Sequence, residues 1–466
     1  MKKVIIVLLL AGAVYACNQM QNDEVSAPPS NMSITFCDSA NGNTLCSYLP
    51  FDVNVQQGFG YTSFLDSAIQ PHFDVFSWQT FVALNWPAGS NGQPAGASIG
   101  DFPNYQRVWE YYQDPAQVFG NALANTVEPL TMHINAAKQQ GLKFLYMDSK
   151  APNALDTVSG FRQADGHPLI DVNLNFVLYE IKMNPTEVTF ITTNNLTTKA
   201  GIDSFAKKNN GFRLPQSDSA NNNPGIIEVK AAWRILDSTK GDDYSRFYTR
   251  DAIIFIDGAH VVNNKQLQFK AKVGLVGMHI IRKTAQFPQK MIWSTFEHID
   301  NTPDNPQDAQ MNKKRWSFYN PDCLNCIPND TPAYQQGDNK VYRWDSTAPW
   351  GKRYAVKPPS QNNVGPLFGT QALRLYPIYK FTEQVNNAWR AKLKGTVWAN
   401  YRLIGSQWQK GETVHPDAPA YLANTTLETY IQPTSSCIGC HGGAHVISGK
   451  DTVKTDLSFI FTIYAK

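Results

Sequence analysis

The feature that most constrains this chain is a pair of cysteines followed by a histidine near the C-terminus. Cys437-Ile-Gly-Cys440-His441 matches the attachment motif of c-type haem. Its two thiols can each bond a haem vinyl group, while the adjacent imidazole ligates the iron. By chance, a chain of this composition would contain about 0.002 such motifs. We therefore predict one covalent haem c on Cys437 and Cys440, with His441 as the proximal ligand. A disulfide beside an incidental histidine is the alternative.

The position of the motif limits how the haem can be covered. Only 25 residues follow His441, and none is methionine, so any second iron ligand must come from upstream. We expect the haem segment, at about residues 420–466, to be built into the end of a large domain. The candidates for the distal ligand are His279 and His298, with Met278 and Met291 weaker because they fit apolar strands.

The other cysteines indicate an oxidising compartment. Cys37 and Cys46 lie in a polar stretch, and we expect them to form a disulfide that closes a loop. Cys323 and Cys326 lie between Pro321 and Pro328, and we expect them to form a small disulfide at the surface. A redox-active dithiol or half of a zinc site are alternatives for this pair, although no second ligand pair lies nearby in the sequence.

The N-terminus predicts export and a lipid anchor. Lys2 and Lys3 precede an apolar run that ends shortly before Cys17, as in a secretory signal peptide of residues 1–16. The run is too short to span a bilayer, which needs about 20 apolar residues. Ala16-Cys17 resembles the cleavage site of bacterial lipoproteins, although Val14 and Tyr15 depart from the usual pattern. We expect lipidated Cys17 to anchor the chain in a membrane.

The resemblance to lipoproteins extends to sorting. Asn18 after the lipidated cysteine resembles the outer-membrane signal of some Gram-negative bacteria, so we expect the protein to face the periplasm or the cell surface. Residues 17–50 are polar, and we expect them to form a tether between the lipid anchor and the folded domain. The formal net charge of +3 does not provide the clustered basic residues that nucleic-acid binding requires.

Hydrophobic patterning predicts an α+β fold with a large, mostly antiparallel sheet and helices at both ends. Residues 51–466 read as a single domain. Strands are expected at 172–182, 226–236, 246–256, 267–273, 291–298 and 457–464. Helices are expected at 73–86, 116–140, 383–393 and 422–431.

Several segments together resemble a family of large bacterial proteins described only as cytochrome c family proteins. They are Trp78-Gln-Thr-Phe-Val-Ala-Leu-Asn-Trp86, Glu228-Val-Lys-Ala-Ala-Trp-Arg234, Trp293-Ser-Thr-Phe-Glu-His-Ile-Asp-Asn301 and residues 424–441. The resemblance covers most of residues 70–466 and implies an exported monohaem lipoprotein. It implies no particular reaction and no catalytic residues.

Two further pairs of ionisable residues are candidates for a site. Glu297 and His298 are adjacent at a strand end, so their side chains should point to opposite faces. Either could act as an acid or base beside the haem, or both could be structural. Glu228 and Lys230 share one face and could form an ion pair.

Three functions are compatible with these features. An electron-transfer cytochrome would fill the sixth iron position with a protein ligand, and its partner would be another redox protein. A haem-dependent oxidoreductase of peroxidase or oxygenase type would leave that position open to a small-molecule substrate. A surface module that uses haem for binding or sensing is the third. We take electron transfer as the leading hypothesis.

Overall fold

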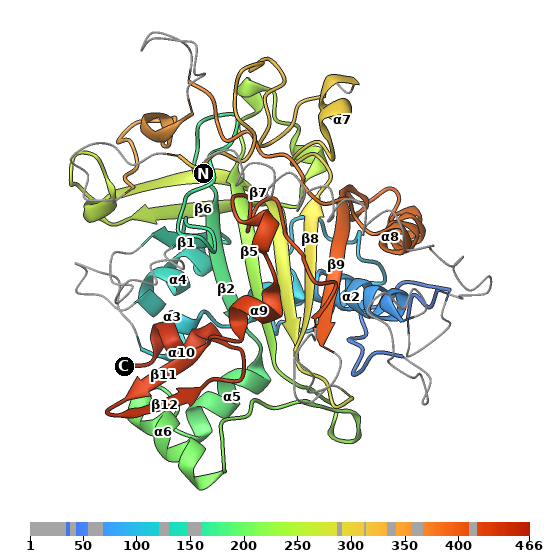
Figure 1. Ribbon diagram of the computed structural model, residues 1–466, viewed down its shortest axis with the longest axis vertical. Helices are drawn as coiled ribbons and strands as arrows, with labels where there is room; N and C mark the ends of the chain where they lie inside the picture. The colour runs from blue at the N-terminus through green and yellow to red at the C-terminus, as the bar shows by residue number, and fades with distance from the viewer. Residues whose placement is uncertain are drawn as a thin grey trace, which may run out of the picture.

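We describe the chain from a computed structural model, at residues 34–37, 43–54, 69–120, 130–147, 160–286, 291–311, 314–332, 342–356, 367–409 and 417–466. Residues 1–16, Cys17 and Asn18 lie outside these ranges. The predicted α+β class is confirmed, with a mostly antiparallel sheet and helices near both ends (Figure 1). No described helix is long and apolar enough to cross a membrane.

Within the described residues, eight strands form the main sheet. They are β1 (Lys143–Met147), β2 (Leu178–Met183), β5 (Ile227–Ile235), β6 (Thr249–Ile256), β7 (Leu267–Arg282), β8 (Ile292–His298), β9 (Tyr401–Gln409) and β10 (Asp417–Ala418). The pairs β3 (Ser217–Asp218) with β4 (Asn223–Pro224), and β11 (His445–Ser448) with β12 (Asp451–Lys454), form small ribbons. All pairings are antiparallel except that of β1 with β6.

The long strand β7 organises the sheet. Its first half pairs with β6 and its second half with β8 along one edge, while β5 pairs along the other edge. The predicted strand at 267–273 covered only the alternating first half. The strand continues to Arg282 because residues 273–282 are buried, and a strand covered on both faces is apolar without alternation.

The described helices cover both faces of this sheet (Figure 1). They are α2 (Gln70–Leu84), α3 (Pro115–Val118), α4 (Leu130–Gln139), α5 (Pro185–Thr193), α6 (Lys199–Lys208), α7 (Pro306–Met311), α8 (Lys380–Lys392), α9 (Cys437–His441) and α10 (Phe459–Tyr464). Helix α2 is buried on nearly every side. Its Trp78 stacks on Trp389 of α8, and its Phe81 stacks on Phe296 of β8.

The opposite face of the sheet carries the C-terminal segment. Met183, Ile281 and Trp293 form one apolar cluster with residues of α9 and α10, including Cys437 and Phe461. Figure 1 shows α9 in front of the central strands, with α10, β11 and β12 below it. The attachment motif is therefore packed on the main sheet rather than held in a separate module.

Two sequence predictions near the C-terminus are wrong. Residues 422–431 form turns rather than a helix, because the Asn424 side chain accepts hydrogen bonds from the Thr426 amide and hydroxyl and so competes with the helical backbone pattern. Residues 459–464 form α10 rather than a strand. Ser458 caps this helix, and its buried Ile460 and Phe461 pack into the core in spite of their strand propensity.

Other boundaries also differ from those predicted. The expected helix at 116–140 is replaced in its described parts by α3 and α4. Within the segment predicted as a polar tether, Phe36 is buried against Trp389, and Leu45 and Leu49 pack on the same core. The packed body therefore begins before residue 51, because scattered apolar residues of the tether find partners on α8.

Candidate haem-attachment site

The attachment motif forms the short helix α9, which is fixed at its N-terminus from two sides. The Ser436 side chain accepts a hydrogen bond from the Gly439 amide at 3.1 Å. Gln407 of β9 accepts one from the Ile438 amide at 2.9 Å. These contacts satisfy amides that have no partner within a helix, so they specify where α9 begins.

The two cysteines of α9 form no disulfide, and their surroundings differ. Cys437 is 8% exposed and belongs to the apolar cluster over the sheet, whereas Cys440 is exposed. They are three positions apart on one turn, which places them on the same side of the helix. Both thiols can therefore react with one ligand bound beside α9.

The imidazole of His441 is oriented by the backbone and by aromatic rings. Its Nδ1 lies 2.8 Å from the Leu457 carbonyl oxygen, so Nδ1 carries the proton and Nε2 keeps its lone pair. The rings of Trp293 and Phe459 each lie 5.2 Å from the imidazole, centroid to centroid. Burial lowers the pKa of His441 to about 4, which keeps the ring neutral and able to ligate a metal.

The carbonyl that orients His441 belongs to a backbone in an uncommon conformation. Asp456 and Leu457 have φ angles of +52° and +72°, a region that a leucine rarely adopts. Asp456 forms a buried ion pair with Lys283 and accepts a hydrogen bond from the Leu214 amide at 2.8 Å. These contacts hold the strained turn, and the turn presents the Leu457 carbonyl to His441.

Charged residues lie on the same face of the sheet as Trp293. His279 of β7 is level with Thr295 of β8, and Lys230 of β5 is level with His279. His279 Nε2 lies 3.4 Å from Glu428 Oε2. Positive charge at His279 and Lys230 contributes to lowering the pKa of His441, so these groups lie within electrostatic range of the imidazole.

The turn before α9 lies very close to the sheet because two strand glycines leave room for it. A Cβ at Gly277 would lie 2.1 Å from Thr426 Oγ1, and one at Gly405 would lie 2.9 Å from Leu422 Cδ1. Asn424 in this turn donates hydrogen bonds to Thr295 and to the Phe296 carbonyl, both at 2.9 Å. The approach to the attachment motif is thereby fixed to β7, β8 and β9.

Glu297 and His298 point to opposite faces of β8, as expected for adjacent strand residues. Glu297 is fully buried, forms an ion pair with Arg374 and accepts a hydrogen bond from the Thr425 amide. It supports the turn before α9 through these contacts.

His298 faces away from the attachment motif. It stacks on Phe247, with ring centroids 4.1 Å apart, and its Nε2 lies 2.9 Å from the Arg246 carbonyl oxygen. Its Nδ1 accepts a hydrogen bond from the Asp300 amide. Both ring nitrogens of His298 have hydrogen-bond partners within the fold, so its contacts are those of a structural residue. Of the two predicted distal histidines, only His279 lies on the face that carries α9.

The expected pairing of Glu228 with Lys230 is replaced by other contacts. The Lys230 ammonium lies over the ring of Tyr179, 5.3 Å from its centroid. Glu228 is buried beside Glu187 and Ser458. Burial, followed by the charge of Glu228, raises the pKa of Glu187 well above its ordinary value, and burial raises the pKa of Glu228 to about 7. The two carboxyl groups therefore carry at least one proton near neutral pH.

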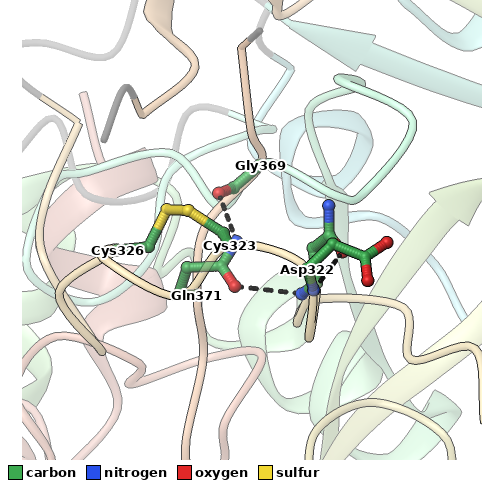
Figure 2. The surroundings of a disulfide bond; sticks show 6 residues. Asp322, Cys323, Cys326, Gly369 and Gln371 are labelled. Carbon is green, nitrogen blue, oxygen red and sulfur yellow. Dashed lines mark hydrogen bonds between the residues drawn. A yellow bond between two sulfur atoms is a disulfide. The ribbon is translucent and has the colours of Figure 1, made fainter. Parts of the chain in front are cut away.

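The remaining described cysteines form two disulfides. One joins Cys37 to Cys46, with Cα atoms 5.6 Å apart. The other joins Cys323 to Cys326 in an irregular loop (Figure 2). Beside it, the Gln371 side chain donates a hydrogen bond to the Gly369 carbonyl and accepts one from the Asn320 amide. No free thiol is left at these positions to hold a cofactor or a metal ion.

Sequence reasoning missed several residues that support the motif. The contribution of Leu457 is a backbone carbonyl, which no side-chain pattern reveals. Lys283, directly after β7, and Gln407 of β9 are distant in the sequence, and only the arrangement of the sheet brings them to the site. Ser436 carried a usable signal, because serine directly before a short helix is a common cap.

The chain was compared with protein-family models, with curated proteins and with solved structures, and none of them matched it.

Proposed function

We propose that this protein is an exported c-type cytochrome that carries one covalently attached haem and transfers electrons. The arrangement of α9 supports the proposal: two cysteines that form no disulfide lie on one turn, followed by a neutral imidazole whose Nε2 remains available. The thiols of Cys437 and Cys440 would each add across one vinyl double bond, sulfur to one carbon and the proton to the other. This addition requires no oxidant or reductant.

The residues around His441 fit a haem. Trp293 and Phe459 provide flat apolar surfaces, and the hydrogen bond from Nδ1 to Leu457 makes Nε2 a stronger donor to iron. Haem, when bound, supplies one-electron chemistry at iron. The chain orients the proximal imidazole and buries part of the site, and both effects tune a reduction potential.

A haem-dependent oxidoreductase is the second candidate function, and one observation favours it. The buried side chains of His279 and Glu428 lie next to each other on the sheet face that carries α9. The Nε2 atom of His279 forms no hydrogen bond of good geometry with the described residues. Such a pair could move a proton at an open iron position. Alternatively, His279 is the sixth iron ligand of an electron-transfer protein.

Absorption spectra separate the two candidates. Electron transfer through an iron with two protein ligands predicts a low-spin ferric spectrum and no change when carbon monoxide is added to the reduced protein. An open position predicts a partly high-spin ferric spectrum and rapid binding of carbon monoxide. Replacing His279 with alanine converts the first behaviour into the second only if His279 is the ligand.

We also propose that lipidated Cys17 anchors the mature protein in a membrane, outward of the cytoplasm. The two disulfides support an oxidising compartment. Cys17→Ser should abolish lipid labelling and release the protein from membranes. Membrane association that survives this change would show that another segment anchors the chain.

A further inference from the structure

A polar cavity lies apart from the attachment motif, between β1, β2, α4 and residues 106–117, which include η1 (Val108–Tyr111). Its volume is about 410 Å³. This is at the small end of the range for ligand-binding pockets, most of which are lined by apolar side chains. The lining of this cavity is instead mainly charged and amide side chains, so it suits a small polar ligand.

The floor of the cavity is a buried network of paired charges. Lys143 is 8% exposed, and its ammonium lies 3.0 Å from Glu110 and 2.6 Å from Glu180. The ammonium of Lys182 lies 3.7 Å from the second oxygen of Glu180. The carboxylates are therefore neutralised from within the protein, and an ionic ligand would have to compete with these pairs.

The floor nevertheless keeps hydrogen-bond acceptors for a ligand. Although burial opposes ionisation, the charges of Lys143 and Arg250 lower the pKa of Glu110 to about 2. Glu110 Oε1 is already engaged by the Lys143 ammonium. Glu180 Oε2, however, lies 3.7 Å from the Lys182 ammonium and accepts no hydrogen bond from the described residues. An ionised carboxylate with a free lone pair accepts hydrogen bonds only, so it seeks a ligand that donates them.

The rim of the cavity adds groups that both donate and accept. Gln106, Gln113, Gln117 and Asn135 line it. Each carboxamide offers a carbonyl acceptor and an amino donor. The rings of Tyr112 and Phe144 form part of the wall and can cover the C–H groups of a ligand.

From this arrangement we propose that the cavity binds a small neutral polyhydroxylated molecule, of the size of a monosaccharide. Hydroxyl groups donate to carboxylates and exchange hydrogen bonds with carboxamides, and a molecule without charge leaves the internal ion pairs intact. An anion would be attracted by Lys138, Lys143 and Lys182, but two carboxylates already engage Lys143. The proposal does not depend on the haem.

Saturation-transfer NMR and calorimetry on the mature full-length protein test the proposal. The probes are methyl β-glucopyranoside, methyl β-galactopyranoside and, separately, inorganic phosphate. We expect at least one glycoside to bind with a dissociation constant in the millimolar range or below, and phosphate not to bind at this site.

Variants then locate the binding. Gln113→Ala with Asn135→Ala removes two exposed rim carboxamides and should weaken glycoside binding about tenfold or more. Gln140→Ala, on an exposed residue just after α4 and outside the cavity, should leave it unchanged. The Cys437→Ala/Cys440→Ala protein should bind the glycoside as the parent does, which separates this proposal from the haem proposal. Binding of neither glycoside, binding unaffected by the rim variant, or binding of phosphate in this cavity would overturn it.

Discussion

Two segments of this chain have the same cysteine spacing and opposite structures. Cys323 and Cys326 lie in an irregular loop between two prolines and are joined in a disulfide. Cys437 and Cys440 lie on the helix α9 and are not joined in a disulfide. The spacing therefore does not determine the chemistry of a CxxC segment. The difference lies in the backbone: the first segment forms turns, whereas capping by Ser436 and Gln407 starts a helix in the second.

The following histidine is the second difference between the segments. Ile327 follows Cys326 and is exposed, whereas His441 follows Cys440 and is held by the Leu457 carbonyl. In the first segment, both cysteines are used in a covalent crosslink within the chain. The other presents three groups that can bind a ligand from outside the chain.

The largest expected effect comes from exchanging cysteines in each segment. Cys437→Ala/Cys440→Ala should remove all covalently held haem, because no thiol remains to form a thioether. Cys323→Ala/Cys326→Ala should leave the haem content unchanged. Haem staining after denaturing electrophoresis measures both. Equal loss from the two variants would break the comparison.

The second prediction concerns the buried carboxyl pair of Glu187 and Glu228, which lies beside Ser458 at the start of α10. Because burial raises the pKa of Glu228 from 4.5 to about 7, the folded state binds more protons than the unfolded state between these values. Stability should therefore fall as the pH rises through this window, and the loss is complete above about pH 7.

Glu228→Gln should remove this loss and stabilise the protein by about 3 kcal/mol at pH 8, with little gain below pH 4.5. Urea unfolding at both pH values measures the difference. Asp322→Asn, in the other CxxC segment, removes an exposed carboxylate and should change the stability by less than about 0.5 kcal/mol. A pH-independent effect of Glu228→Gln would contradict the assignment.

Part of the fold was predictable from the sequence, because the first half of β7 alternates, α8 has a clear hydrophobic period and α2 is apolar on nearly every side. The strands β1, β9 and β10 were not predicted. The sequence indicates the candidate site only where side chains would carry its chemistry, at Cys437, Cys440 and His441.

The turn at 422–431 was mistaken for a helix because Leu427 and Ile431 are four residues apart, as on one face of a helix. Its Asn and Thr side chains instead form hydrogen bonds with the backbone. The strand residues that this turn contacts, at Gly277 and Gly405, are brought together by the register of the sheet. A single sequence does not specify that register.

The third prediction concerns the crosslink in the first segment. Opening the Cys323–Cys326 disulfide frees a very short loop, and the chain-entropy relation gives a destabilisation of about 2 kcal/mol. Comparison of the Cys323→Ala/Cys326→Ala variant with the parent by urea unfolding gives this value. Loss of the haem spectrum in this variant would show that the two segments are coupled.

The smallest effect is expected at the cap of α9. Ser436→Ala removes the acceptor for the Gly439 amide and should cost about 1 kcal/mol of local stability. Faster amide hydrogen exchange at residues 438–440, with exchange near Cys323 unchanged, would report it. Unchanged exchange in α9 would show that Gln407 alone fixes its start.

The intact mass of the wild-type protein under denaturing conditions tests the central claim most directly. The protein should be matured in cells that supply the haem-attachment machinery, and then extracted with acid and acetone before the measurement. We predict the mass of the mature chain plus one haem, with the haem on the peptide that contains Cys437 and Cys440. A mass without haem, with these two cysteines joined in a disulfide, would contradict the account.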